Sequence, residues 1–131
     1  MTQLQDIAQH IKDRIDNGTT LTAMIGMRNA GNTLPACVFE ITSATANIHM
    51  PAQGTNLYDM TVEVNIFADT TFALLGLVDT VLTAFYGVAT LGGITSACTA
   101  ASFTIRTETQ ADGAEGDERV ATITLQLQAG L

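Results

Sequence analysis

The sequence predicts a single α+β domain in which two helices pack on one face of one mixed or antiparallel sheet, in the order αβββαββ. Three observations lead to this class. Two segments carry apolar residues at helical spacing, the other regular segments alternate apolar and polar residues, and every strand has one apolar face. A chain of 131 residues can bury a proper core, and it contains neither a repeat nor a linker, so residues 1–131 are taken as one domain of about four to five strands.

The centre of the prediction is the stretch from Leu57 to Arg106, which is typical of a strand, a helix and a second strand. The first strand alternates Met60, Val62, Val64 and Ile66 with polar residues. Asp69, Thr70 and Thr71 offer N-caps for a helix over 72–86, whose apolar stripe is Leu74, Leu75, Val78, Val81, Leu82 and Phe85. Gly87 is the expected helix end, Gly92 and Gly93 the turn, and 101–107 the next strand, with Phe103 and Ile105 on its apolar side.

The N-terminal part predicts a helix followed by a hairpin. Leu4, Ile7, Ala8, Ile11 and Ile15 share one helical face between a Thr2 cap and a Gly18 end. Strands over 21–27 and 37–41 are expected to pair as the hairpin. The segment 43–56 then reads as a long loop, since Pro51 and Gly54 interrupt regular structure.

The C-terminal part predicts a second hairpin around an acidic tip at 108–118, with the last strand over 121–127. The tip is either a solvated turn or a contact segment. The sheet face away from the helices is polar but nearly uncharged, as surfaces that meet other proteins often are. That face is expected to carry Thr61, Asn65, Thr104, Thr122, Thr124 and Gln126.

Composition favours a protein with much of its surface in contact with partners. Hydrophobic residues make up 47% of the chain and charged residues 14%, with a formal net charge of −8. No Lys or Arg lies between Arg28 and Arg106, so the cations that tight nucleic-acid binding requires are missing. An acidic surface that DNA passes without being held remains possible.

No catalytic or cofactor motif is present. The sequence has no P-loop, no dinucleotide fingerprint and no nucleophile elbow, and Ser43, Ser96 and Ser102 have no local triad partner, although triads assemble in space. Cys37 and Cys98 are read as buried small hydrophobes rather than as a disulfide or, with the two histidines, a zinc site. His10 is expected at the surface or its boundary. We therefore expect no enzyme activity, no metal and no cofactor.

The termini and the longest apolar run suggest neither export nor membrane insertion. Met1 leads into Gln, Asp and His rather than into a basic and then apolar run, which is unlike a signal peptide. The run 72–91 is apolar, but Asp79 lies in its middle and no Lys or Arg flanks it. A buried helix is the preferred interpretation.

The order of elements resembles the tail terminator, or tail completion, proteins of long-tailed bacteriophages. The resemblance rests on the opening helix 4–15, on the strand TVEVNIFAD that runs into the helix TTFALLGLVDTVLTAFYG, and on the closing hairpin from ASFTIRTET to ERVATITLQLQ. It spans nearly the whole chain, through patterns rather than invariant residues.

The resemblance implies a virion structural protein, assembled in the host cytoplasm, that forms a ring at the head-proximal end of the tail. Such a ring, hexameric in the family, ends tube polymerisation and joins the tail to the neck while leaving a channel for DNA. The implied partners are further copies of the chain, the tail tube protein and a neck, stopper or connector protein, with DNA passing through without specific binding. The implied contact residues are Phe72, Ala73, Leu77, Thr80, Ala84, Arg106, Asp112, Glu115, Asp117, Glu118 and Arg119.

Two alternatives remain open. Another neck component, such as a head-completion protein, would share the structural role. A soluble dimeric ligand-binding module would instead require a concave pocket with converging polar groups.

Overall fold

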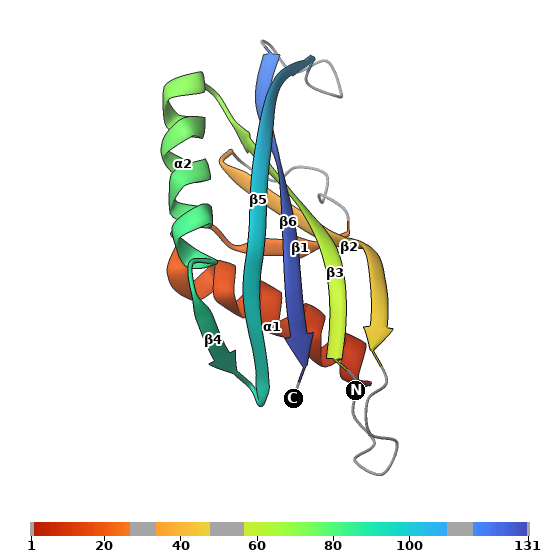
Figure 1. Ribbon diagram of the computed structural model, residues 1–131. Helices are drawn as coiled ribbons and strands as arrows, with labels where there is room; N and C mark the ends of the chain where they lie inside the picture. Colours follow the sequence, from red (N-terminus) through yellow and green to blue (C-terminus); the bar gives the residue numbers. More distant parts are fainter. Residues whose placement is uncertain (1, 27–33, 48–56, 110–116, 131) are drawn as a thin grey trace.

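The computed structural model describes residues 2–26, 34–47, 57–109 and 117–130. Its elements are α1 (Gln3–Gly18), β1 (Ala23–Ile25), β2 (Ala36–Asn47), β3 (Leu57–Ala68), α2 (Thr71–Ala84), β4 (Val88–Leu91), β5 (Ile94–Thr109) and β6 (Asp117–Gly130). One curled mixed sheet has the strand order β1-β2-β3-β6-β5-β4 (Figure 1). The α+β class is confirmed. The sheet has six strands rather than four to five, and the order of elements is αβββαβββ.

Both helices begin where the sequence predicts, because local hydrogen bonds satisfy their first N–H groups. Thr2 and Gln5 form a capping box at α1, in which the Thr2 hydroxyl accepts from the Gln5 N–H and the Gln5 side chain accepts from the Thr2 N–H. The Thr70 hydroxyl accepts from the Ala73 N–H at 3.2 Å and caps α2.

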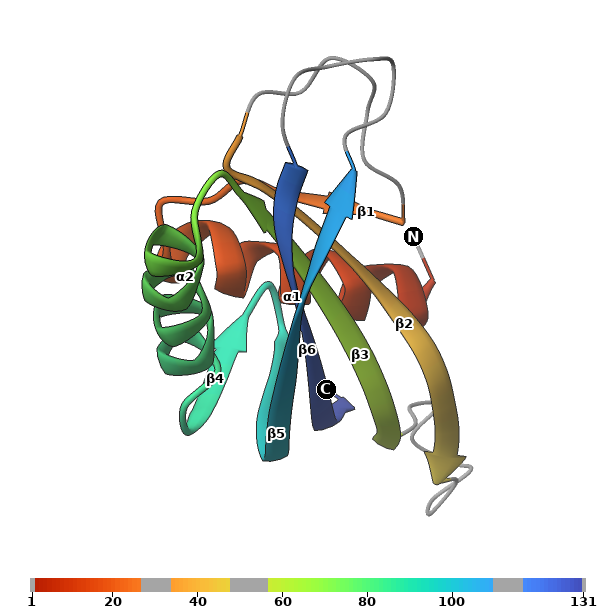
Figure 2. The same cartoon turned by 90° about the horizontal axis from the view of Figure 1, so that it is seen from above.

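The helices pack on the same face of the sheet and share one core (Figure 1 and Figure 2). The core is built from the apolar stripe of each helix and the inward residues of the central strands. Its members include Ile7, Ile11, Ile15, Val62, Val64, Ile66, Leu74, Val78, Val81, Phe85, Ile123 and Leu125. This burial is the main stabilising contribution in a chain without disulfides among its described residues.

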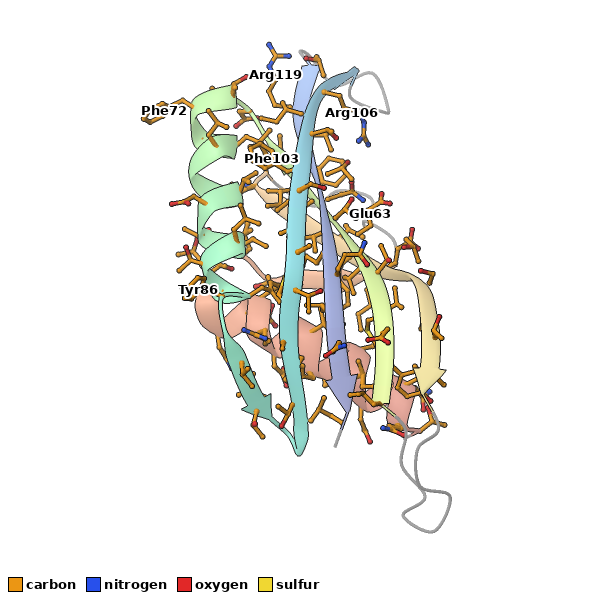
Figure 3. All side chains as sticks on the ribbon, in the orientation of Figure 1. Glu63, Phe72, Tyr86, Phe103, Arg106 and Arg119 are labelled. Atoms are coloured by element: carbon orange, nitrogen blue, oxygen red, sulfur yellow. The ribbon has the colours of Figure 1, made fainter. Side chains whose placement is uncertain are left out.

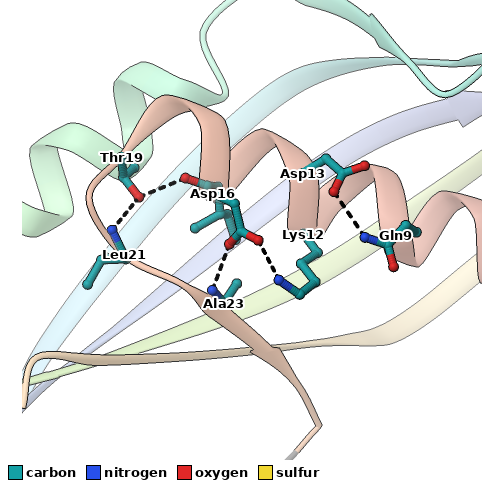
Figure 4. A network of polar contacts seen from close by, with 8 residues as sticks. Gln9, Lys12, Asp13, Asp16, Thr19, Leu21 and Ala23 are labelled. Carbon is teal, nitrogen blue, oxygen red and sulfur yellow. Dashed lines mark hydrogen bonds and ion pairs between the residues drawn. The ribbon is translucent and has the colours of Figure 1, made fainter. Parts of the chain in front are cut away.

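The predicted hairpin between the first two strands is wrong, because β1 runs parallel to β2. The start of β1 is held by the end of α1: the Asp16 carboxylate accepts from the Ala23 N–H at 2.8 Å and pairs with Lys12 (Figure 4). The Thr19 hydroxyl accepts from the Leu21 N–H at 3.0 Å (Figure 4). These bonds lead the chain directly from the helix into the outermost strand position.

Part of the predicted loop 43–56 is strand. β2 continues to Asn47, and a register shift between Ile41 and Ser43 leaves Thr42 as an additional residue in the β2–β3 pairing. Residues 48–56, which include His49, lie outside the described part of the chain.

The apolar run 72–91 divides into a helix and a strand. α2 ends at Ala84 with Phe85 as its C-cap, and β4 pairs with the start of β5 through the turn at Gly92 and Gly93, where φ is 61° and 81°. The sequence prediction missed β4 and began the following strand seven residues too late. Among the described residues, no helix has the length and apolarity needed to span a membrane.

Candidate subunit interface

The outer side of α2 carries large apolar side chains that the core does not use. Leu74, Val78 and Val81 fill the inward stripe, so Phe72 lies on the opposite side of the helix and is 90% exposed. Figure 3 shows Phe72 projecting away from the sheet at the N-terminal end of α2. At the other end, Tyr86 is 89% exposed and Val88 of β4 is also exposed. The predicted stripe was wrong at Leu75, which is exposed.

The second half of β5 is uncovered on the face where the helices pack. Phe103 pairs with Ile123, and Ile105 pairs with Ala121. Both partners are fully buried, so Phe103 and Ile105 point to the helix side of the sheet, yet they are 43% and 37% exposed. Neither helix covers this end of β5. We call the exposed set Phe72, Leu75, Tyr86, Val88, Phe103 and Ile105 the apolar flank.

The opposite sheet face carries a polar ladder that crosses three strands. Arg106 of β5 donates to the Thr122 hydroxyl at 2.6 Å, and Thr122 donates to the Asn65 side-chain oxygen at 2.7 Å. Thr61 donates to Gln126 at 3.0 Å. The prediction that this face is polar is confirmed for these residues. It is wrong near the start of β2, where Val38 and Val120 are buried on the same face.

Charge is distributed unevenly over that polar face. Arg106 lies on β5 and Glu63 on β3 (Figure 3). Glu40 of β2 stands directly opposite Glu63, near the β2 edge. Two carboxylates at opposed positions of neighbouring strands repel one another.

The structure brings together some of the predicted contact residues. Phe72, Ala73, Thr80 and Arg106 are exposed, while Leu77, Ala84 and Arg119 are half-buried. Leu77 and Ala84 pack against the core. Arg119 donates to the Thr107 hydroxyl at 2.6 Å. Asp112 and Glu115 lie outside the described residues, and for Asp117 and Glu118 the structure gives backbone pairing with Thr109 and Glu108.

Two depressions in the described surface are small and shallow. One of about 250 Å³ lies on the polar face between Ser43, Asp59, Thr61 and Gln126, and another of about 240 Å³ lies beside Leu57 and Gly130. Sites for small molecules are typically clefts of roughly 300–1,000 Å³. These two depressions lie below that range.

A buried polar cluster joins α1 to the end of α2 and to β5, and sequence reasoning missed it. Arg14 donates to the Ala84 carbonyl at 3.0 Å and to the Ser96 hydroxyl at 2.9 Å, and its guanidinium lies 5.0 Å from the centre of the Phe85 ring. His10, expected at the surface, is 2% exposed. His10 and Arg14 are polar residues four positions apart on the buried face of α1, and this spacing was the sequence signal that could have indicated the cluster.

The hydrogen bonds of His10 define its protonation. Nδ1 lies 3.2 Å from the Leu91 carbonyl oxygen, which can only accept, so Nδ1 carries the hydrogen and Nε2 accepts from the Ser96 hydroxyl at 2.6 Å. Burial lowers the pKa of His10, and the nearby Arg14 charge lowers it further. A serine beside a histidine suggests a nucleophile, but Ser96 is 1% exposed and no substrate can reach its hydroxyl.

The two cysteines are free. Burial raises the pKa of Cys37 to about 12 and also raises the pKa of the half-buried Cys98. Both thiols therefore stay protonated at neutral pH and behave as small apolar groups. Among the described residues, no group of His, Cys, Asp and Glu is arranged to hold a metal ion.

Replacing His10 with glutamine is expected to flatten the dependence of stability on pH. His10 is neutral in the folded protein, whereas an unfolded histidine takes up a proton near pH 6.5. The unfolded state binds the extra proton, so wild-type stability falls as the pH drops below about 6.5 towards the lowered folded pKa. Urea midpoints at pH 7.5, 6.5 and 5.5 would measure this loss. Parallel pH profiles for the wild type and His10→Gln would contradict it.

The chain matches no protein-family model, and no curated protein is significantly similar to it. Functional inference therefore depends on the surface described above and on the element pattern.

Proposed function

We propose that this protein is a tail terminator of a long-tailed bacteriophage, which forms a ring at the head-proximal end of the tail. The ring, hexameric by resemblance to that family, ends tube polymerisation and joins the tail to the neck. Its partners are other copies of the chain, the tail tube protein and a neck, stopper or connector protein. It has no catalytic role, and DNA passes through it without specific binding.

The apolar flank is the observation that carries this proposal. Phe72 and Tyr86 are about nine-tenths exposed, and Phe103 and Ile105 are uncovered on the helix side of the sheet. Single exposed apolar residues are ordinary, but several large ones on α2, β4 and β5 of one small domain indicate a protein–protein surface. The sparse charge of the polar sheet face supports the same role, because the centres of interfaces are depleted in charged residues.

Light scattering and electron microscopy test the ring, with the purified protein alone and with a candidate tail tube protein from the same genome. We expect a discrete oligomer with a central opening, or assembly on contact with tail tubes. Phe72→Ser is expected to prevent assembly without lowering the melting temperature, because Phe72 makes little of the core. Leu4→Ser, at an exposed apolar position on α1 outside the apolar flank, is the matched control and should assemble normally.

A protein that stays monomeric at high concentration and also in assembled particles would overturn the ring. A small molecule that raises the melting temperature and binds near one of the depressions would favour the dimeric ligand-binding module. Co-purification with a portal or head protein, but not with tail tubes, would favour another neck component. A major tail protein encoded immediately downstream would support the terminator.

A further inference from the structure

Two long strand segments at opposite edges of the sheet have no neighbouring strand among the residues that the structure describes. β4 pairs with β5 only as far as Ala97, and β1 pairs with β2 only as far as Phe39. Beyond these points lie the β5 bare edge, Thr99–Thr107, and the β2 bare edge, Glu40–Ala46. All their residues are exposed apart from the half-buried Ile41, whereas burial alternates along β3. Exposed backbone N–H and C=O groups of this kind readily pair with another strand.

We propose that the β5 bare edge of one copy pairs antiparallel with the β2 bare edge of the next copy, so that the sheet continues across the subunit boundary. This inference rests on the ring proposed above and identifies its contact. β2, β3, β6 and β5 alternate in direction, so β2 and β5 run opposite ways. Rotating one copy into the next around a ring therefore brings β5 against β2 in antiparallel orientation.

The side chains of the two bare edges fit each other in one register. Phe103 points to the helix side, and so does Ala44, because its partner Met60 is buried. Placing the large Phe103 opposite the small Ala44 leaves room for the ring. Because Thr42 is an additional residue, the same register brings Ile105 opposite Ile41 and Arg106 opposite Glu40. The pairing ends at Arg106, because β1 occupies the edge of β2 up to Phe39.

The charges support this register. Arg106 and Glu40 both lie on the polar face, at opposite edges of the sheet. Glu40 faces Glu63 within its own subunit, and an arginine from the next copy would offset that repulsion. Arg106 would keep its hydrogen bond to Thr122, because its guanidinium has several donors.

The displacement between copies agrees with a closed ring. Phe103 pairs with Ile123 of β6, which in turn pairs with Val64 of β3. Ala44 of β2 pairs with Met60, four residues earlier on β3. Each joint therefore shifts the next copy by four residues of β3, or about 13 Å, while four strands span about 19 Å. The resulting tilt of about 35° between strands and ring axis is at the lower end of the range in closed barrels, roughly 35–45°.

Disulfide trapping tests the pairing. In this register Ser102 lies opposite Thr45, with both side chains on the polar face. Ser102→Cys and Thr45→Cys would be combined in a Cys98→Ser background; Cys37 can stay, because it is fully buried. Mild oxidation of the assembled protein should yield a ladder of covalent oligomers. A mixture of the two single variants should give dimers only, and Thr124→Cys with Thr45→Cys, one strand further in, should give none.

Each outcome decides between the proposals. Oligomers that light scattering detects but that give no ladder would overturn the edge pairing and leave the ring standing. Dimers from Ser102→Cys alone would mean that two β5 edges meet about a two-fold axis, which also overturns it. A chain that is monomeric in every preparation overturns the ring and the pairing together.

Charge reversal provides a second measurement. Arg106→Glu and Glu40→Arg should each weaken assembly by tenfold or more, and the double variant should regain most of the loss. Absence of recovery in the double variant would contradict the Arg106–Glu40 contact.

Discussion

Replacing Arg14 with methionine is expected to lower the free energy of unfolding by about 3–5 kcal/mol. Methionine fills a similar volume, so little of this loss comes from a cavity. The loss arises because the carbonyls of Ala84 and Ser96 and the Ser96 hydroxyl lose a buried donor. Arg14 also places a positive charge at the C-terminal end of α2, where the helix dipole favours it. Urea unfolding followed by circular dichroism measures the change.

Two further variants make this prediction decisive. Lys12→Met, on the same helix, removes a partly exposed ammonium that pairs with Asp16 and should cost far less. Arg14→Lys keeps the charge but cannot reach several acceptors at once, so its loss should be intermediate. A change below about 1 kcal/mol for Arg14→Met would show that the buried cluster contributes little to stability.

Replacing Gly18 with alanine is expected to destabilise the protein by about 1–3 kcal/mol, opposite in sign to the usual effect in a helix. A Cβ at Gly18 would lie 2.6 Å from the Ala84 Cβ and 3.3 Å from its Cα, so α1 and α2 would have to separate. Gly76→Ala is the matched control, since nothing lies within 4 Å of a Cβ there. It should stabilise the protein by about 0.5–1 kcal/mol.

The double variant Gly18→Ala, Ala84→Gly tests whether the close approach is the cause. Removing the Ala84 methyl restores the space, so the double variant should be more stable than the sum of the single losses predicts. Thermal unfolding of the four proteins gives the coupling. Additive losses would mean that strain at the end of α1, rather than the contact with α2, limits this position.

The sequence predictions differ most from the structure at the candidate subunit interface. Phe72 was expected at a contact surface and is exposed, but Phe103 and Ile105 looked like core residues. Alternation shows which side chains share a face of a strand, and it cannot show how far a helix extends over that face. The sequence prediction missed the β2 bare edge for a related reason. The small and polar residues at 43–47 are typical of a loop, and only their pairing with β3 shows that they form a strand.

Short-range patterns alone determined the capped helices, the alternating strands β3 and β6, and the closing hairpin. Their causes are local: a hydroxyl three residues from an N–H, or an apolar residue at every second position. The parallel placement of β1, the added strand β4 and the burial of His10 and Arg14 became visible only in three dimensions. Each depends on groups far along the chain, such as the Leu91 carbonyl and Ser96, which lie 81 and 86 residues from His10 and which no local pattern can bring to it.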